Sequence, residues 1–440
     1  MKEKLTLSQK LTRRKYKPAN KIIWWFFKNL VIDPFLAPKY NPHYVIKDNI
    51  NDEKGPAFVL YNHQSRMDYI WAVQATYPKV LTFVTGYNEF FRSKFDLIFK
   101  LIHQIPKKNF VADIASIRAM DQVIKAGGTV CLAPEGMSSI TGHNQPIAPG
   151  TGKLLKHYKI PVYLVKQKGA FLTNHKVCLD ERKGRIDVEF YKLFTPEQLD
   201  KLSIQEIEDQ LNIALWQDDY EWEKKEHIQF KTNHRAAEHL HDLIYYCPRC
   251  KQEFTMLGKD DTIKCLSCNN GAKINDYYQF IPLDDKCILP STPSKWVDYE
   301  RELIKKEIRN NPNYCFEEDV TLGKLPEYKL LKNNATSIIC GEGKLIVDHQ
   351  GYHFRGTKDN KPFNFDLNYK EVHTLVIVTD CTFSNIYYNG EYYDLFPKRP
   401  SVGKLLLVVE EMHRLHENSW KQLPWLNEFK DEDGNLPPLD

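Results

Sequence analysis

A histidine and an aspartate near the start of the chain have the spacing of a catalytic pair. His63 follows the apolar run FVLY at 58–61, and Asp68 comes five residues later in the stretch NHQSRMD. A neutral imidazole at the end of a strand is a suitable general base. If a helix begins just after His63, a carboxylate one turn further on could hold the second ring nitrogen. We therefore interpret His63 as a base and Asp68 as the group that orients it.

No nucleophile accompanies this pair. Neither Ser65 nor a nearby cysteine is clearly placed for attack, so the base would activate a hydroxyl of the substrate. The alternative is a histidine that caps a helix beside an unrelated surface aspartate.

Four of the ten cysteines form a second chemical pattern. They stand in CPRC at 247–250 and CLSC at 265–268, with fourteen residues between the pairs. Two such turns can complete a tetrahedral shell of four thiolates, which has no open position for catalysis. We predict a structural zinc site at Cys247, Cys250, Cys265 and Cys268, with iron as the main alternative to zinc and a redox dithiol as the main alternative to a metal.

The elements around His63 indicate an α/β fold. Short apolar runs at 57–61, 80–85, 129–134, 160–165 and 186–191 alternate with amphipathic stretches. This order predicts a mixed, largely parallel sheet flanked by helices. Ligands of such sheets bind at the carboxyl ends of the strands. Since His63 and Glu135 each follow a strand-like run, we expect both to face one crevice.

Four blocks of this region resemble the glycerolipid acyltransferases, the 1-acyl-glycerol-3-phosphate acyltransferase family. NHQSRMD matches the family's NHx4D motif, and APEGMSS at 133–139 resembles its FPEGTRS block. The stretches at 90–109 and 146–165 are looser counterparts of its second and fourth blocks. Together the blocks span roughly residues 45–195, under half of the chain.

The resemblance implies a reaction. His63 would take the proton from the free hydroxyl of a lysophospholipid, most simply lysophosphatidic acid, as that oxygen attacks an acyl thioester, and Asp68 would orient His63. The donor would be acyl-CoA or acyl-acyl-carrier protein, with neither a covalent intermediate nor a catalytic cofactor. The Glu135–Gly136 turn would contact the glycerol-phosphate head. The candidate substrate-binding residues are Asn62, Arg66, Lys107, Lys108, Glu135, Gly136 and Ser139.

The chain departs from the family at its phosphate-binding arginines. Ser138 stands where the third block has an arginine, and Asn109 stands where the second block ends in one. Leu164 replaces the second proline of the fourth block. Lysine does not replace the bidentate fork of arginine. Either Lys107, Lys108 or Arg66 therefore binds the phosphate, or the head group is not a simple phosphate monoester. The alternative for the two lysines is a solvated helix end.

The amino terminus has the composition of a membrane-interfacial segment. Residues 1–30 hold nine Lys or Arg against one acid, and the apolar run IIWWFF occupies 22–27. The run is too short to span a bilayer and lacks a cleavage site for a signal peptidase. Cations followed by aromatic rings suit an anionic lipid surface. Packing of IIWWFF on the following domain is the alternative.

The rest of the chain divides by composition. We expect the interfacial segment over 1–45, the acyltransferase domain with a helical extension over 46–245, the zinc ribbon over 246–283 and a linker with a helix over 284–319. Short alternating strands and one late helix over 320–420 resemble a pleckstrin-homology-like (PH-like) domain, and 421–440 would be a tail. Within these parts DDKCILPSTPSKWVD at 284–298 is the predicted linker, and DEDGNLPPLD at 431–440 has the composition of a disordered tail.

Several other residues carry weaker indications. We expect His143 to be an ordinary loop residue, and His234, His239 and His241 to be solvated. The remaining candidates, which we expect in the core, are Cys131, Cys178, Cys340 and Cys381.

Composition favours an intracellular protein that works at a membrane. A net charge of +4 and a ribbon without a dense basic patch argue against nucleic acid. Scattered cysteines without a signal sequence favour a reducing compartment. We therefore expect a cytoplasmic acyltransferase peripheral to the inner face of the membrane, with a catalytically degenerate lipid-binding scaffold that recruits partners through its ribbon and PH-like domain as the alternative.

Overall fold

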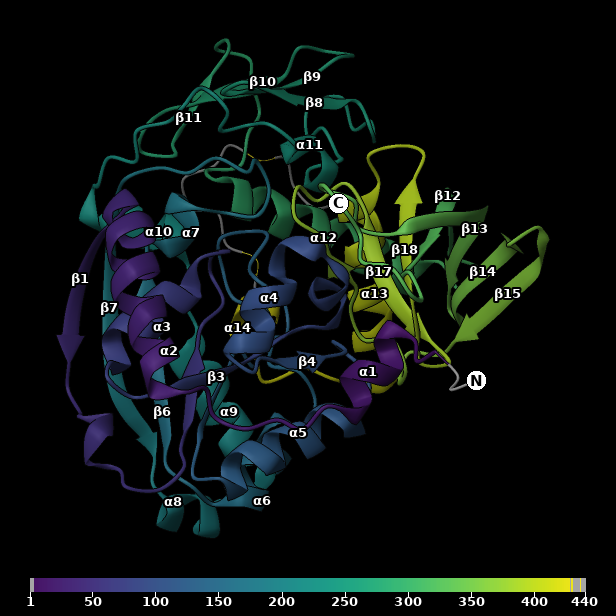
Figure 1. Ribbon diagram of the computed structural model, residues 1–440. Coiled ribbons are helices and arrows are strands. Elements are labelled where there is room, and N and C mark those ends of the chain that lie inside the picture. Colours follow the sequence, from purple (N-terminus) through teal and green to yellow (C-terminus); the bar gives the residue numbers. More distant parts are fainter. Residues whose placement is uncertain (1–3, 428, 430–435, 437–440) are drawn as a thin grey trace.

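The computed structural model describes residues 4–427, 429 and 436, which fold into three packed parts (Figure 1). The amino-terminal part is built on a seven-stranded sheet, a small four-stranded sheet follows, and the carboxy-terminal part carries a second seven-stranded sheet. The predicted α/β class, with an appended cysteine cluster and a mainly β carboxy-terminal region, is confirmed.

The first sheet has the order β1-β7-β6-β2-β5-β3-β4. Its strands are β1 (Asn41–Ile46), β2 (Phe58–Tyr61), β3 (Leu81–Gly86), β4 (Ile105–Lys107), β5 (Thr129–Leu132), β6 (Val162–Lys168) and β7 (Arg185–Phe194). All neighbouring pairs are parallel except β6 and β7. The sheet is therefore mixed and largely parallel, as predicted.

Helices cover both faces of this sheet, because the side chains of a strand alternate between its faces. In β2, Val59 and Tyr61 pack with α3 (Asp68–Thr76), whereas Phe58 and Leu60 pack in a second cluster with α5 (Ile114–Lys125). The other helices of this part are α1 (Leu7–Arg13), α2 (Lys21–Phe27), α4 (Ser93–Leu101), α6 (Thr151–Tyr158), α7 (Ala170–Thr173), α8 (Pro196–Lys201), α9 (Ile204–Leu215) and α10 (Asp219–Glu226).

The sheet begins earlier in the chain than expected. β1 begins inside the segment 1–45 that we assigned to the membrane interface, and it pairs in parallel with β7 from Asn41 to Ile46. Pro42 obscured this strand, because proline suits only the edge of a sheet and β1 is an edge strand.

The middle part holds the cysteine pairs. It contains α11 (Leu240–Leu243) and four antiparallel strands, which are β8 (Met256–Lys259), β9 (Thr262–Cys265), β10 (Gly271–Ile274) and β11 (Phe280–Pro282). The helix α12 (Pro293–Asn310) follows. It begins inside the stretch 284–298 that we expected to be a linker, and it buries Trp296 completely. Its start is Pro293 after the capping residue Thr292, so the proline opens a helix here.

The carboxy-terminal sheet is antiparallel, in the order β15-β14-β13-β12-β18-β17-β16. Its strands are β12 (Cys315–Lys324), β13 (Ile338–Asp348), β14 (Gly351–Lys358), β15 (Lys361–Leu367), β16 (Val376–Ile377), β17 (Ser384–Tyr388) and β18 (Glu391–Pro397). The helix α13 (Val402–Glu417) packs with α12 and β13. These elements agree in order with the resemblance to a PH-like domain, which stays a prediction.

The carboxy-terminal part shares its core with the amino-terminal part. One cluster of buried side chains runs from Met137 and Ile140 to Leu405 and Val409. The short helix α14 (Pro424–Asn427) returns to the first part, where Trp425 stacks on Trp216 with ring centroids 4.1 Å apart. Of the predicted disordered stretch 431–440, only residue 436 is among the described residues.

Three of the four cysteines expected in the core, Cys131, Cys178 and Cys381, are buried, and Cys340 is half-buried. No helix of the described ranges combines the length and the apolar character needed to cross a bilayer.

Candidate functional site

His63 and Asp68 form a hydrogen-bonded pair. Their Nδ1 and Oδ2 atoms lie 2.7 Å apart, the Asp68 side chain is buried, and the His63 side chain is 26% exposed. Burial raises the pKa of Asp68, and the hydrogen bond from His63 opposes that rise. Because Nδ1 faces the carboxylate, Nε2 is the ring nitrogen left for a substrate.

Ser65 fixes the carboxylate of this pair. Oδ1 of Asp68 accepts the Ser65 hydroxyl at 2.9 Å and its backbone N–H at 3.0 Å. The helix α3 begins at Asp68 itself and not just after His63, so residues 62–67 form a tight loop and Asp68 occupies the first turn. A carboxylate in that position is favoured by the helix dipole. Ser65 is thus a positioning residue that the sequence did not reveal.

Glu135 meets the His63 loop at the edge of the sheet. β2 and β5 are parallel neighbours, so their carboxyl ends reach the same edge. The backbone N–H of His63 donates to Oε2 of Glu135 at 2.6 Å, and the backbone N–H of Ser139 donates to the His63 carbonyl at 2.7 Å. Two hydrogen bonds therefore hold His63 against the turn that follows β5.

The Glu135 carboxyl is buried, and burial raises its pKa to about 8. Its second oxygen accepts the amide of Asn144, whose own carbonyl accepts the amide of Gln64 at 2.9 Å. The Glu135 carboxyl therefore joins the loop after β2 to the loop that contains Asn144. Asn144 lies in a polar loop nine residues after Glu135, and nothing in its local sequence marks this contact.

Gly136 adopts a backbone conformation, and lies close to a neighbouring ring, in a way that favours glycine. Its φ is +76°, and a Cβ at this position would lie 2.9 Å from Cε1 of Phe110. Asn109, which stands in place of the family's arginine, donates its amide to the Gly136 carbonyl at 2.7 Å. This asparagine thus supports the turn.

Asn62 has both amide atoms engaged inside the protein. Its Nδ2 donates to the Gln167 carbonyl at 2.8 Å, and its Oδ1 accepts the Gln167 backbone N–H at 2.7 Å. The hydroxyl of Ser139 is likewise engaged, since it donates to the His143 carbonyl at 2.7 Å. These contacts link the ends of β2 and β6 and close the loop after Glu135.

The three candidate phosphate-binding cations differ in their contacts. Nζ of Lys107 donates to two carbonyls of its own loop, the nearer at 2.6 Å. Nζ of Lys108 donates to the Gly390 carbonyl at 2.5 Å and lies over the Tyr87 and Tyr387 rings. Arg66 is half-buried, and within the described part of the chain its guanidinium makes no hydrogen bond or ion pair, with Nε buried and without a partner.

The other histidines do not join this site. His143 is buried in its loop and pairs with Asp298 of α12 at 3.2 Å, so it is more than the ordinary loop residue that we expected. His234 and His239 pair with neighbouring aspartates at 2.8 and 3.1 Å. His241 accepts the backbone N–H of Gly258 at 3.2 Å. In the described ranges none of these three belongs to a metal-binding cluster.

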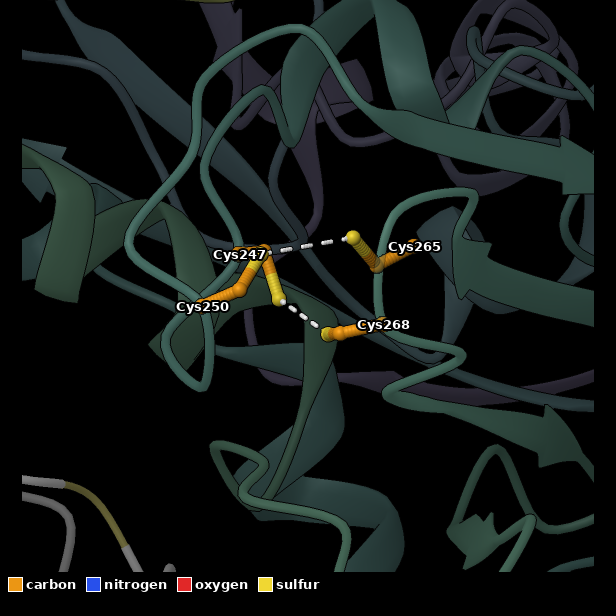
Figure 2. A group of neighbouring side chains, drawn as sticks. All are labelled: Cys247, Cys250, Cys265 and Cys268. Atoms are coloured by element: carbon orange, nitrogen blue, oxygen red, sulfur yellow. Dashed lines mark hydrogen bonds between the residues drawn. The ribbon is translucent and has the colours of Figure 1, made fainter.

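The four paired cysteines come together as predicted (Figure 2). Their sulfur atoms all lie within 4.8 Å of one another, with Cys247–Cys268 and Cys250–Cys265 at 3.6 Å. Sulfur atoms bound to one zinc ion at 2.3 Å would be about 3.8 Å apart in a tetrahedron. The cluster therefore fits a single metal ion.

Comparison with known proteins agrees with this site. Residues 41–166 match the family model Acyltransferase, a stretch that includes His63, Asp68 and Glu135. None of the curated proteins matches the chain. Among solved structures, the 1-acyl-sn-glycerophosphate (LPA) acyltransferase PlsC from Thermotoga maritima is similar at 14% identity and a TM-score of 0.37. The similarity covers 47% of this chain and 79% of that one. Because the TM-score is low, we base no conclusion on this similarity. The family match and the motifs therefore show that residues 41–166 are similar to the Acyltransferase family.

Proposed function

We propose that the protein transfers a fatty acyl group from acyl-CoA or acyl-acyl-carrier protein to the free hydroxyl of a lysophospholipid, with lysophosphatidic acid as the first acceptor to test. The observation that carries this proposal is the His63–Asp68 pair, at 2.7 Å, on the sheet edge that also holds Glu135.

The pair supports direct transfer of the acyl group from the donor to the acceptor. Nε2 of His63 takes the proton of the acceptor hydroxyl while that oxygen attacks the thioester carbonyl. As the tetrahedral intermediate collapses, the C–S bond breaks and the imidazolium returns the proton to the leaving thiolate. Asp68, held by Ser65, keeps the ring in place and stabilises its positive charge in a buried setting. No covalent acyl-enzyme is needed.

Arg66 is the side chain that we assign to the acceptor phosphate. It stands three residues after His63, and within the described ranges its guanidinium makes no hydrogen bond or ion pair, with Glu181 attracting its charge only at longer range. Lys107 and Lys108 would first have to give up the carbonyls that they already bind. A guanidinium also offers phosphate two parallel hydrogen bonds.

We further propose that the amino-terminal segment lies on the inner face of the cell membrane. α2 is divided, since Trp24 is buried in the core whereas Ile22, Trp25 and Phe26 are exposed. The exposed apolar side chains continue through the π-helix Lys28–Leu36 to Phe35, which is 69% exposed. Exposed cations such as Lys21 lie beside them. Apolar rings next to cations match the chemistry of an anionic lipid surface.

The metal at the cysteine cluster is proposed to be zinc with a structural role. Four thiolates leave no open coordination position, so the metal would hold together the two cysteine turns of the small four-stranded sheet.

One experiment tests the acyl transfer. The purified full chain is given lysophosphatidic acid with labelled acyl-CoA or acyl-acyl-carrier protein, beside the His63→Ala variant. We expect a labelled diacyl product from the wild type and a loss of about 10²–10⁴ in rate for the variant. A chain that binds lysolipid but acylates none of a panel would instead be a lipid-binding scaffold, and a fully active variant would exclude His63 as the base.

A further inference from the structure

The carboxy-terminal part covers the turn that contains Glu135. The backbone N–H of Ile377 points at Sδ of Met137 with 3.0 Å between N and S. The ring of Phe110, which packs over Gly136, meets the ring of His373 edge to face at 5.0 Å. Residues from the far end of the chain therefore form one wall beside the candidate active site.

A small cavity lies between this wall and the Glu135 turn. Its volume is about 10 Å³, room for one group of the size of a water molecule. The lining residues on which the argument rests are Phe110, Glu135, Gln145, His373, Thr374 and Trp420. They come from the loops after β4 and β5, from the segment before β16 and from the loop after α13.

The lining of this cavity carries no free cation. Among the described residues that line it, none is a lysine or an arginine. The carboxylate of Glu410 also lines it, but Arg301 donates to one of its oxygens at 2.7 Å and Thr374 donates to the other at 2.7 Å. An anionic group would therefore find no counter-charge here.

Neutral hydrogen-bonding groups remain available instead. His373 is buried, and its Nε2 has no partner within the described part of the chain. Burial, assisted by His413, lowers the pKa of His373 to about 4, so its ring is neutral at pH 7. In the same described ranges the Gln145 amide makes no hydrogen bond, and the Thr374 oxygen retains acceptor capacity. A buried nitrogen without a partner is costly unless a ligand completes it.

We propose that this cavity is part of the binding site for the acceptor. His373, Thr374 and Gln145 would there bind one uncharged hydroxyl group of the acceptor's head group. This assignment rests on the proposed acyl transfer, and it specifies which class of lysophospholipid is the acceptor. A single hydroxyl matches the size of the cavity, and it can both donate to and accept from the neutral groups around it. A phosphate is too large for the space and finds no cation. The acceptor is therefore a lysophospholipid whose head group carries a free hydroxyl beyond the phosphate.

The test compares two acceptors on the full-length protein. Lysophosphatidylglycerol has a hydroxyl-bearing head group, whereas lysophosphatidic acid ends at its phosphate. We expect the wild type to favour lysophosphatidylglycerol in kcat/KM, and His373→Phe to raise KM for that acceptor about tenfold while KM for lysophosphatidic acid is unchanged. His157→Phe, the same change at an exposed histidine, should alter neither value.

The outcomes separate the subsite from the reaction. If His373→Phe lowers the thermal midpoint, Gln145→Leu, at a half-buried loop position, is used in its place, with the same selective rise in KM expected. Equal effects on both acceptors, or no effect on either, would overturn the subsite while acyl transfer stands. If the wild type acylates neither acceptor, the proposed function fails, and the subsite fails with it.

Discussion

Glu135 accepts a hydrogen bond from the backbone N–H of His63, with 2.6 Å between the nitrogen and Oε2. The two residues belong to loops that follow neighbouring parallel strands, and the bond joins these loops at the sheet edge. The position of the imidazole therefore depends on the turn after β5 as well as on Asp68. Substitutions on either side should act on the same reaction through different physical effects.

Asp68→Asn should lower kcat by about 10²–10⁴ with little change in KM for the acceptor. The amide keeps the shape of the side chain but removes the charge that stabilises the imidazolium. Steady-state rates of acyl transfer measure this effect. Asp121→Asn, which removes an aspartate paired with Lys125 on the surface of α5, is the matched control. A comparable loss in both variants would contradict the assignment of Asp68.

Glu135→Gln should make stability less dependent on pH. The pKa of Glu135 is raised from 4.5 to about 8 in the folded protein. Between these values the folded state holds a proton that the unfolded chain has released, so stability falls as pH rises. The thermal midpoint of the wild type should therefore drop by more between pH 5 and pH 8 than that of the variant. Parallel curves for the two proteins would show that Glu135 does not titrate in this window.

Arg66→Lys should raise KM for lysophosphatidic acid about tenfold while kcat changes little, because a point charge replaces a bidentate fork. Lys108→Met should change KM by less than about twofold, since the Lys108 ammonium is already held by the Gly390 carbonyl. Initial rates at varied acceptor concentration give both constants. If Lys108→Met has the larger effect on KM, Lys108 and not Arg66 binds the acceptor phosphate.

Cys250→Ser should remove the metal and lower the thermal midpoint. Elemental analysis of the wild type should find one zinc per chain, because four sulfur atoms within 4.8 Å form one site. Binding of a structural metal contributes several kcal/mol to folding. Cys315→Ser, at an exposed cysteine of β12, should leave both metal content and midpoint unchanged. Protein without zinc or iron after gentle purification would rule out the site.

Phe35→Asp should weaken binding to vesicles of anionic phospholipid, because it places a negative charge within the exposed apolar face of the amino-terminal segment. Ile213→Asp is the matched control, since Ile213 is 72% exposed on α9 and Phe35 is 69% exposed. Cosedimentation with vesicles measures the bound fraction of each variant. Equal binding by the wild type and both variants would show that the membrane-binding surface of the protein does not include Phe35.

The meeting of His63 and Glu135 was predictable from the sequence. Both follow short apolar runs in an alternating α/β pattern, and parallel strands bring their carboxyl ends to one edge. β2 lies beside β5 in parallel, and His63 and Glu135 are joined by a hydrogen bond. The cysteine cluster was predictable for a similar reason, because the spacing within each CxxC turn limits where the two thiols can point.

The contacts of the lysines were not predictable. Lys107 and Lys108 stand in a motif block that indicates phosphate binding, yet Lys108 binds the carbonyl of Gly390. That partner lies 282 residues further along the chain, and no local pattern reports a contact at this separation. Ser65 and Asn144 were missed because small polar residues in loops are common, and only the folded geometry shows that they hold Asp68 and Glu135.

The carboxy-terminal part covers the Glu135 turn, and this has a consequence for folding during synthesis. Phe110 and Met137 leave the ribosome long before His373 and Trp420, which line the same small cavity. The nascent amino-terminal part therefore contains His63 and Asp68 early but keeps part of a shared core uncovered until α13 emerges. The Glu135 turn is thus buried completely only after nearly the whole chain has been translated.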